Sequence, residues 1–172
     1  MGSTESVHSL GIAVLTVSDT RDKSNDASGD ALVAALSDSG HTLAERRIVG
    51  DDIYRIRSAV SAWIAEPGVD VVLTTGGTGL TGRDGTPEAV VPLLDKLIDG
   101  FGELFRVLSF EEIGTSSLQS RCIAGVANST YVFCLPGSTN ACRTAWDKLI
   151  AAQLDSRTRP CNLVDLMPRL GE

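Results

Sequence analysis

The stretch that decides the fold is Val71-Val72-Leu73-Thr74-Thr75-Gly76-Gly77-Thr78-Gly79. Its first half is short and apolar, which is typical of a strand buried in a parallel sheet. Its second half contains three glycines, whose backbones adopt positive φ easily and allow a ligand to approach closely. Successive amide groups in such a turn form a nest for an anion. A tight turn alone would need only one or two glycines, so the loop predicts an anion-binding site.

Apolar runs and helical patterns alternate on both sides of this stretch. Strands are predicted at residues 10–17, 42–49, 69–75, 122–126 and 131–135, and helices at residues 28–39, 53–64, 87–98, 100–110 and 141–154. The alternation predicts one α/β domain, residues 10–160, with a mainly parallel sheet covered on both faces. An antiparallel strand near residues 131–135 would make the sheet mixed. Residues 1–9 and 161–172 are expected to be tails, and residues 157–172 to be irregular.

The composition excludes several kinds of function. A net charge of −7 and only two histidines argue against nucleic-acid or membrane partners, a zinc site and a Ser-His-Asp triad. No stretch approaches the ~20 apolar residues of a membrane span, and residues 1–9 lack a secretory signal. The four cysteines form no C-x-x-C pair, so we expect reduced thiols and a cytoplasmic protein.

Asp84 lies in a glycine-flanked loop, Gly82-Arg83-Asp84-Gly85, just before a predicted helix. Two roles are open for it. It could cap the helix or interact with the helix dipole. Alternatively, it could hold Mg²⁺ against ligand phosphates, because Mg²⁺ takes one or two carboxylates together with phosphate oxygens.

Two further polar loops follow predicted strands and should meet the glycine loop at one edge of the sheet. Ser18-Asp19 ends the first strand, and Pro136-Gly137-Ser138-Thr139 opens the last helix, where free amides favour a phosphate. Ser138 is also a good helix cap. Asp51-Asp52 follows the second strand and is either a solvated turn with a helix cap or a source of another carboxylate.

At Thr75-Gly76-Gly77-Thr78-Gly79, with Asp84 five residues on, the sequence resembles the MoaB/Mog family of molybdopterin-binding proteins. The resemblance covers about residues 10–161. It extends to Leu15-Thr16-Val17-Ser18-Asp19, to residues 101–116 and to Pro136-Gly137-Ser138-Thr139. It implies a three-layer α/β/α fold that assembles as a homo-oligomer, a trimer or a hexamer.

The ligand that the resemblance implies is molybdopterin, a pterin with a dithiolene and a terminal phosphate. Adenylyltransferases of the family use ATP and Mg²⁺ to adenylylate it and release pyrophosphate. The resemblance implies that residues 75–79 bind phosphate and that Ser18, Asp19 and Ser138 line the pocket. It also makes Asp84 and Asp51 catalytic, with Asp84 holding Mg²⁺, although Asp51 here follows Val49-Gly50 where the family's enzymes have a Val-Pro pair.

Two functions from different classes remain open at this point. One is a Mg²⁺-dependent molybdopterin adenylyltransferase, a nucleotidyltransferase. The other is a non-catalytic protein of the same pathway that binds the pterin but not ATP. Phe101, Leu104, Phe105 and Leu108 share one face of a predicted helix, which is either core or, as we hypothesise, a subunit interface.

Overall fold

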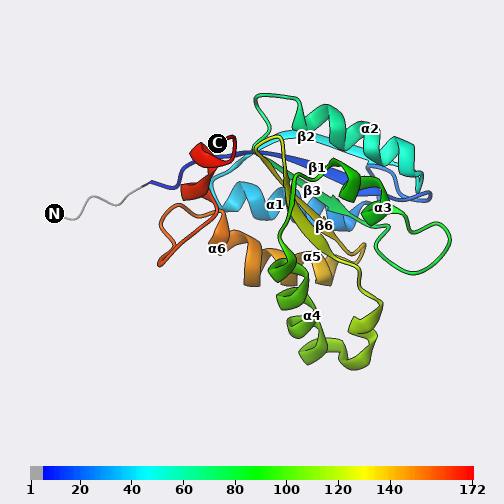
Figure 1. The fold of residues 1–172 in the computed structure, drawn as a ribbon. Helices are drawn as coiled ribbons and strands as arrows, with labels where there is room; N and C mark the ends of the chain where they lie inside the picture. Colours follow the sequence, from blue (N-terminus) through cyan, green and yellow to red (C-terminus); the bar gives the residue numbers. More distant parts are fainter. Residues whose placement is uncertain (1–5) are drawn as a thin grey trace.

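The computed structural model describes residues 6–172, so residues 1–5 of the predicted N-terminal tail lie outside the described part of the chain. Six strands form one mixed sheet in the order β2-β1-β3-β6-β5-β4 (Figure 1). They are β1 (Gly11–Val17), β2 (Thr42–Val49), β3 (Val71–Thr75), β4 (Lys96–Leu97), β5 (Ile123–Ala127) and β6 (Thr130–Leu135). The neighbours β2, β1, β3 and β6 run parallel.

Helices cover both faces of this sheet, which confirms the predicted three-layer α/β/α fold (Figure 1). One face carries α1 (Ala27–Asp38), α4 (Asp99–Ile113) and α5 (Thr139–Ala145), which continues through a π-helical turn into α6 (Ala151–Gln153). The other face carries α2 (Ile53–Ile64) and α3 (Thr86–Val90). Because β1, β3 and β6 are buried on both faces, they are mostly apolar, with threonine as their main polar residue.

Two predicted elements were wrong. The expected helix at residues 87–98 is only the short α3, followed by a 3₁₀ turn (Val91–Leu93) and by β4, which pairs with β5. Pro92 explains this, because proline lacks the amide hydrogen that a continuing helix needs. The antiparallel strand is β5 rather than residues 131–135, since β6 runs parallel to β3.

The C-terminal segment also has more structure than expected. It contains a 3₁₀ helix, Val164–Arg169, where the sequence predicted an irregular chain. Val164 is buried in the core, and the Tyr131 hydroxyl donates a hydrogen bond to the Leu163 carbonyl at 2.8 Å. Among residues 6–172, no helix has the length and apolar character needed to cross a membrane.

Helix α4 separates its apolar residues between two faces. Phe101 and Phe105 are buried against the sheet, whereas Leu104, Val107 and Phe110 are each more than half exposed. Apolar side chains gathered on a surface commonly mark a protein interface.

We therefore expect the protein to sediment as more than one chain, and Val107→Glu to shift it toward a smaller species because a charge cannot be buried there cheaply. Light scattering and sedimentation velocity measure both. Ala62→Glu, on the exposed side of α2, is the matched control and should leave the mass unchanged. A monomeric wild-type protein would end the interface hypothesis.

Candidate functional site

A cleft of about 650 Å³ lies at the carboxyl ends of β1, β3 and β6. Sites for small molecules typically have volumes of roughly 300–1,000 Å³. The loops after these three strands form most of its wall, as expected at the edge of an open α/β sheet. The rest of the wall comes from helix α4, from the 3₁₀ helix after it (Gly114–Gln119) with Ser120, and from Ala141 of α5.

Most of the site residues predicted from the sequence line this cleft. They are Ser18, Gly76, Gly77, Thr78, Gly79, Asp84, Pro136, Gly137 and Ser138. Thr75 lies behind the glycine loop, where its hydroxyl donates to the Pro136 carbonyl at 2.9 Å. Asp19 and Asp51 lie outside the lining and contact each other.

Sequence reasoning missed the remaining lining residues. Thr20 and Arg21 could have been found, because they follow Ser18-Asp19 in the same loop. The others come mainly from the α4 region, which the family resemblance covered without assigning its residues to the cleft. They are Val17, Phe105, Ser109, Ile113, Ser116, Gln119, Ser120 and Ala141.

The glycine loop needs its glycines because the chain packs closely against it. Gly76 and Gly77 have φ of +103° and +68°, a region that residues with side chains rarely adopt. A Cβ atom on Gly76 would lie 2.2 Å from the Val17 carbonyl oxygen, and one on Gly77 would lie 2.3 Å from the Thr86 hydroxyl. The Gly76 amide donates to the Leu135 carbonyl at 3.0 Å, which ties the loop to the end of β6.

Arg121 holds the outer side of the same loop. Its Nε donates to the Gly79 carbonyl at 2.8 Å, and its Nη2 donates to the Asp84 carbonyl at 3.1 Å. The guanidinium also pairs with Glu88, and the Arg121 amide donates to the Thr78 carbonyl. Arg121 thus donates hydrogen bonds to three carbonyls of the loop, so the loop has a defined shape before any ligand binds.

Asp84 is an ionised carboxylate held at a fixed place on the cleft wall. The Thr81 hydroxyl and amide donate to its Oδ2 at 2.6 and 2.8 Å. The hydroxyl bond is the main cause that holds the pKa of Asp84 below its usual value, aided by backbone amides and nearby Arg121 and opposed by burial. Asp84 does not cap α3, because Gly85 occupies that position and no side chain caps it.

Asp19 and Asp51 join the loops after β1 and β2. Each accepts a hydrogen bond from the other's backbone amide at 3.0 Å, and Arg83 pairs with Asp19 at 2.6 Å. Burial, and then the negative charge of Asp19, raise the pKa of Asp51. Asp52 takes the expected cap role, because its side chain accepts from the Arg55 amide at the start of α2.

Asp51→Asn should make the protein more stable to urea at pH 7. The folded state raises the pKa of Asp51 above 3.8, so ionised Asp51 costs stability once the pH exceeds that folded-state pKa. The gain should shrink as the pH falls and disappear below 3.8, where both states hold the proton. Urea unfolding over a pH series tests this, with exposed Asp38→Asn as control. A variant less stable than wild type at pH 7 would contradict the prediction.

A divalent cation would have one protein carboxylate to bind here. Among residues 6–172, no three His, Cys, Asp or Glu side chains come together in a way that could hold a metal ion. Mg²⁺ often needs fewer, since it binds one or two carboxylates and takes its other ligands from substrate phosphates and water. Ionised Asp84 beside an anion-binding loop fits that mode.

The chain thus has an open α/β sheet whose edge holds one cleft, lined by a glycine loop, one arginine and an ionised carboxylate. This architecture is typical of domains that bind small anionic ligands. The family described as a probable molybdopterin binding domain matches residues 13–156. The chain belongs to this family, the MoaB/Mog family.

Relatives and solved structures agree with this membership. The chain is 59% identical to molybdenum cofactor biosynthesis protein B of Escherichia coli, over 88% of this chain and 89% of that protein. A crystal structure of a molybdenum cofactor biosynthesis protein B aligns with a TM-score of 0.87 and 42% identity, covering 97% and 99% of the two chains. The tungsten cofactor synthesizing protein MoaB from Pyrococcus furiosus aligns at 0.78 and 34%, covering 97% and 100%.

Proposed function

We propose that this chain binds molybdopterin in the cleft and adenylylates it with ATP, as a step of molybdenum cofactor biosynthesis. Family membership and the names of the relatives support the ligand and the pathway. The observation that carries the proposal is the glycine loop beside ionised Asp84, on the wall of a cleft sized for a small molecule.

The proposed chemistry suits a cleft without histidine. The terminal phosphate of molybdopterin attacks the α-phosphorus of ATP, a new P–O bond forms, and pyrophosphate leaves. The attacking oxygen is already anionic at neutral pH, so no general base is needed. Catalysis then depends on positioning and on charge neutralisation. The loop amides would bind phosphate oxygens, and Asp84 would hold Mg²⁺, whose charge would offset that of the phosphates.

Pyrophosphate release tests the reaction directly. Purified protein is mixed with molybdopterin, ATP and Mg²⁺, and each component is omitted in turn. We expect release only when all three are present. Release without the pterin would indicate ATP hydrolysis and would contradict the proposal.

The second candidate is a protein that binds molybdopterin and does not adenylylate it. The position of Asp51 favours this candidate, because its carboxylate accepts from the Asp19 amide and is absent from the cleft wall. Titration calorimetry separates the two functions. The adenylyltransferase should bind both pterin and ATP, whereas the binding protein should bind the pterin alone and release no pyrophosphate.

A further inference from the structure

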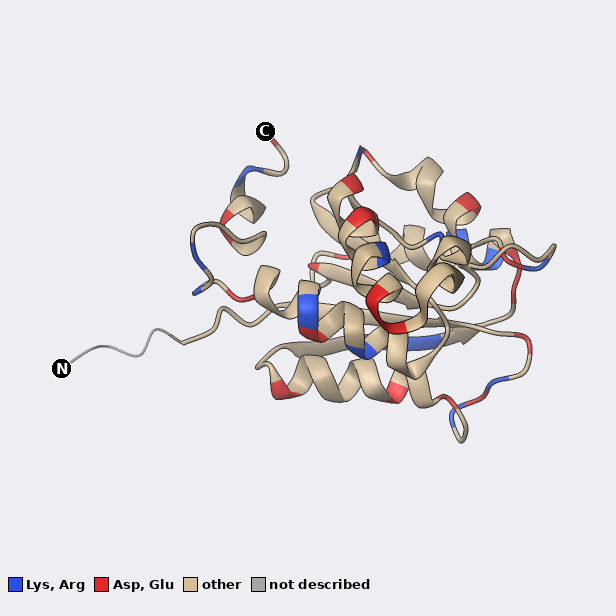
Figure 2. Ribbon diagram, turned by 90° about the horizontal axis from the view of Figure 1, so that it is seen from below, with Lys and Arg blue, Asp and Glu red and all other residues tan. Residues whose placement is uncertain are grey.

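Arg21 is the one positively charged side chain on the cleft wall in the part of the chain that the structure describes. Elsewhere, basic and acidic residues are interspersed along the ribbon (Figure 2). With a net charge of −7, the protein as a whole repels anions. An anionic ligand therefore depends on local positive charge, and in this cleft Arg21 supplies it.

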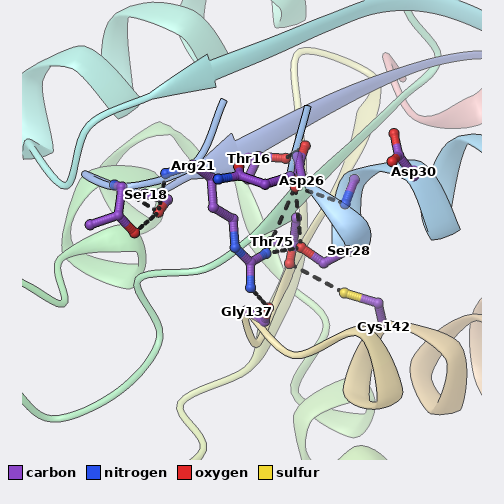
Figure 3. Close-up of polar contacts among 12 residues, drawn as sticks. Thr16, Ser18, Arg21, Asp26, Ser28, Asp30, Thr75, Gly137 and Cys142 are labelled. Atoms are coloured by element: carbon purple, nitrogen blue, oxygen red, sulfur yellow. Dashed lines mark hydrogen bonds and ion pairs between the residues drawn. The ribbon is translucent and has the colours of Figure 1, made fainter. Parts of the chain in front are cut away.

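The side chain of Arg21 is held between two loops of the cleft (Figure 3). Its Nη1 donates to the Ser28 hydroxyl at the start of α1, and its Nη2 donates to the Gly137 carbonyl at 3.0 Å. A guanidinium has five N–H groups, so among residues 6–172 these two bonds leave three N–H groups without a hydrogen-bond acceptor. The side chain is 32% exposed. The charge is thus fixed in position and still accessible.

The positive charge of Arg21 is not the main counter-charge of buried Asp26. Its carboxylate accepts from Arg46 and from the Thr16 hydroxyl, each at 2.7 Å, and from the Gly29 amide at 3.1 Å. The guanidinium of Arg21 lies farther away, at 3.7 Å. Arg46, which also pairs with exposed Asp30, is therefore the nearest counter-charge for Asp26. Arg21 makes no hydrogen bond to Asp26, so its N–H groups can bind a second anion.

We propose that Arg21 binds a phosphate group of the ligand and determines the preference of the cleft for phosphorylated ligands. A guanidinium matches two phosphate oxygens with parallel, charge-assisted hydrogen bonds. Because its contacts to Ser28 and Gly137 already restrict the side chain, little conformational freedom is lost when the ligand binds. This inference rests on the proposed function, in which the cleft holds molybdopterin. The phosphate belongs either to the pterin or to ATP, which also contains phosphates.

Titration calorimetry with Arg21→Gln and Arg21→Lys tests the proposal. The ligands are molybdopterin, its dephosphorylated form and ATP. We expect Arg21→Gln to weaken binding of the phosphorylated ligand roughly 10- to 100-fold. The loss should be smaller for Arg21→Lys, which keeps the positive charge but cannot donate two parallel hydrogen bonds to a phosphate. Arg143→Gln, on the exposed side of α5, removes the same charge away from the cleft and should leave affinity unchanged.

The dephosphorylated pterin gives the sharpest comparison. If Arg21 binds the pterin phosphate, Arg21→Gln should hardly weaken binding of the dephosphorylated form. The losses of affinity caused by the substitution and by removal of the phosphate are then not additive. A loss confined to ATP would assign the arginine to the nucleotide phosphates. Equal losses for phosphorylated and dephosphorylated pterin, with ATP binding unchanged, would mean that Arg21 only shapes the loops and would overturn the proposal. So would unchanged affinity for every ligand.

If the cleft does not hold molybdopterin, the result is different, because the wild type then binds no pterin at all. Pyrophosphate serves as the probe in that case. Wild-type binding that Arg21→Gln abolishes would still support a phosphate site at Arg21, and equal binding by both would overturn it. Urea unfolding of both variants confirms that the comparison is made on folded protein.

Discussion

Asp84→Asn should reduce pyrophosphate release at least about 100-fold while leaving molybdopterin bound. Removing one preorganised charge-stabilising group from an active site typically costs roughly 100- to 1,000-fold in rate. Asparagine has nearly the same shape as aspartate, and its carbonyl oxygen can still accept from Thr81, so the loop should keep its conformation. The variant loses the negative charge that would hold Mg²⁺ against the phosphates.

Steady-state turnover and pterin affinity should be measured together on this variant. The expected pattern is a large fall in kcat with little change in the dissociation constant for the pterin. Asp38→Asn, an exposed carboxylate at the end of α1, makes the same chemical change away from the cleft and should behave as wild type. Normal turnover by Asp84→Asn would remove the metal role of Asp84.

Asp26→Ala should lower the free energy of unfolding by about 3–5 kcal/mol, the usual effect of removing one partner from a buried ion pair. Asp26 is fully buried, and its loss leaves the mostly buried Arg46 without its shortest inward contact. It also leaves the buried Thr16 hydroxyl without its acceptor and α1 without its N-cap. Burial opposes ionisation of Asp26, yet hydrogen bonds from Arg46, Thr16 and Gly29 outweigh it and lower its pKa.

The lowered pKa of Asp26 determines how its contribution to stability depends on pH. A carboxylate with a lowered folded-state pKa contributes stability above its unfolded value, here 3.8, and loses it as the pH falls through the folded-state pKa. The difference between wild type and Asp26→Ala should therefore be largest near neutral pH and smaller in acid.

Asp30 provides a matched control for Asp26, because it pairs with the same Arg46 at the same 2.7 Å. Its side chain is 61% exposed, so Asp30→Ala should cost no more than about 1 kcal/mol. Urea unfolding at pH 7 compares the two variants. Equal losses would show that burial of Asp26 is not what makes its contacts important.

Most of the fold could be predicted because each buried strand is a continuous apolar run. The strands of a parallel sheet also bring their following loops to one edge, so the meeting of three polar loops followed from the topology. The strand directions at residues 123–135 could not be predicted. A hairpin pattern shows that two strands are antiparallel to each other, but not which of them pairs with β3.

The lining of the candidate site could be predicted only where local motifs mark it. The glycine loop, Asp84 and the loop after β6 are recognisable because glycine, proline and small polar residues follow strands directly. Phe105 and Ser109 line the cleft because α4 packs against α5, where Glu112 accepts from Thr144 and Asn140. Those contacts join residues about 30 positions apart, and no local pattern reports them.

The tie between the Gly76 amide and the Leu135 carbonyl has a consequence for how the protein is made. The loops after three strands form most of the cleft wall, and the last of these strands, β6, ends at Leu135. A nascent chain that has emerged only as far as β5 contains the glycine loop but not the strand that fixes its position. Ligand affinity should therefore arise late in synthesis and mark completion of the sheet. A bound ligand would in turn stabilise the whole domain rather than one loop.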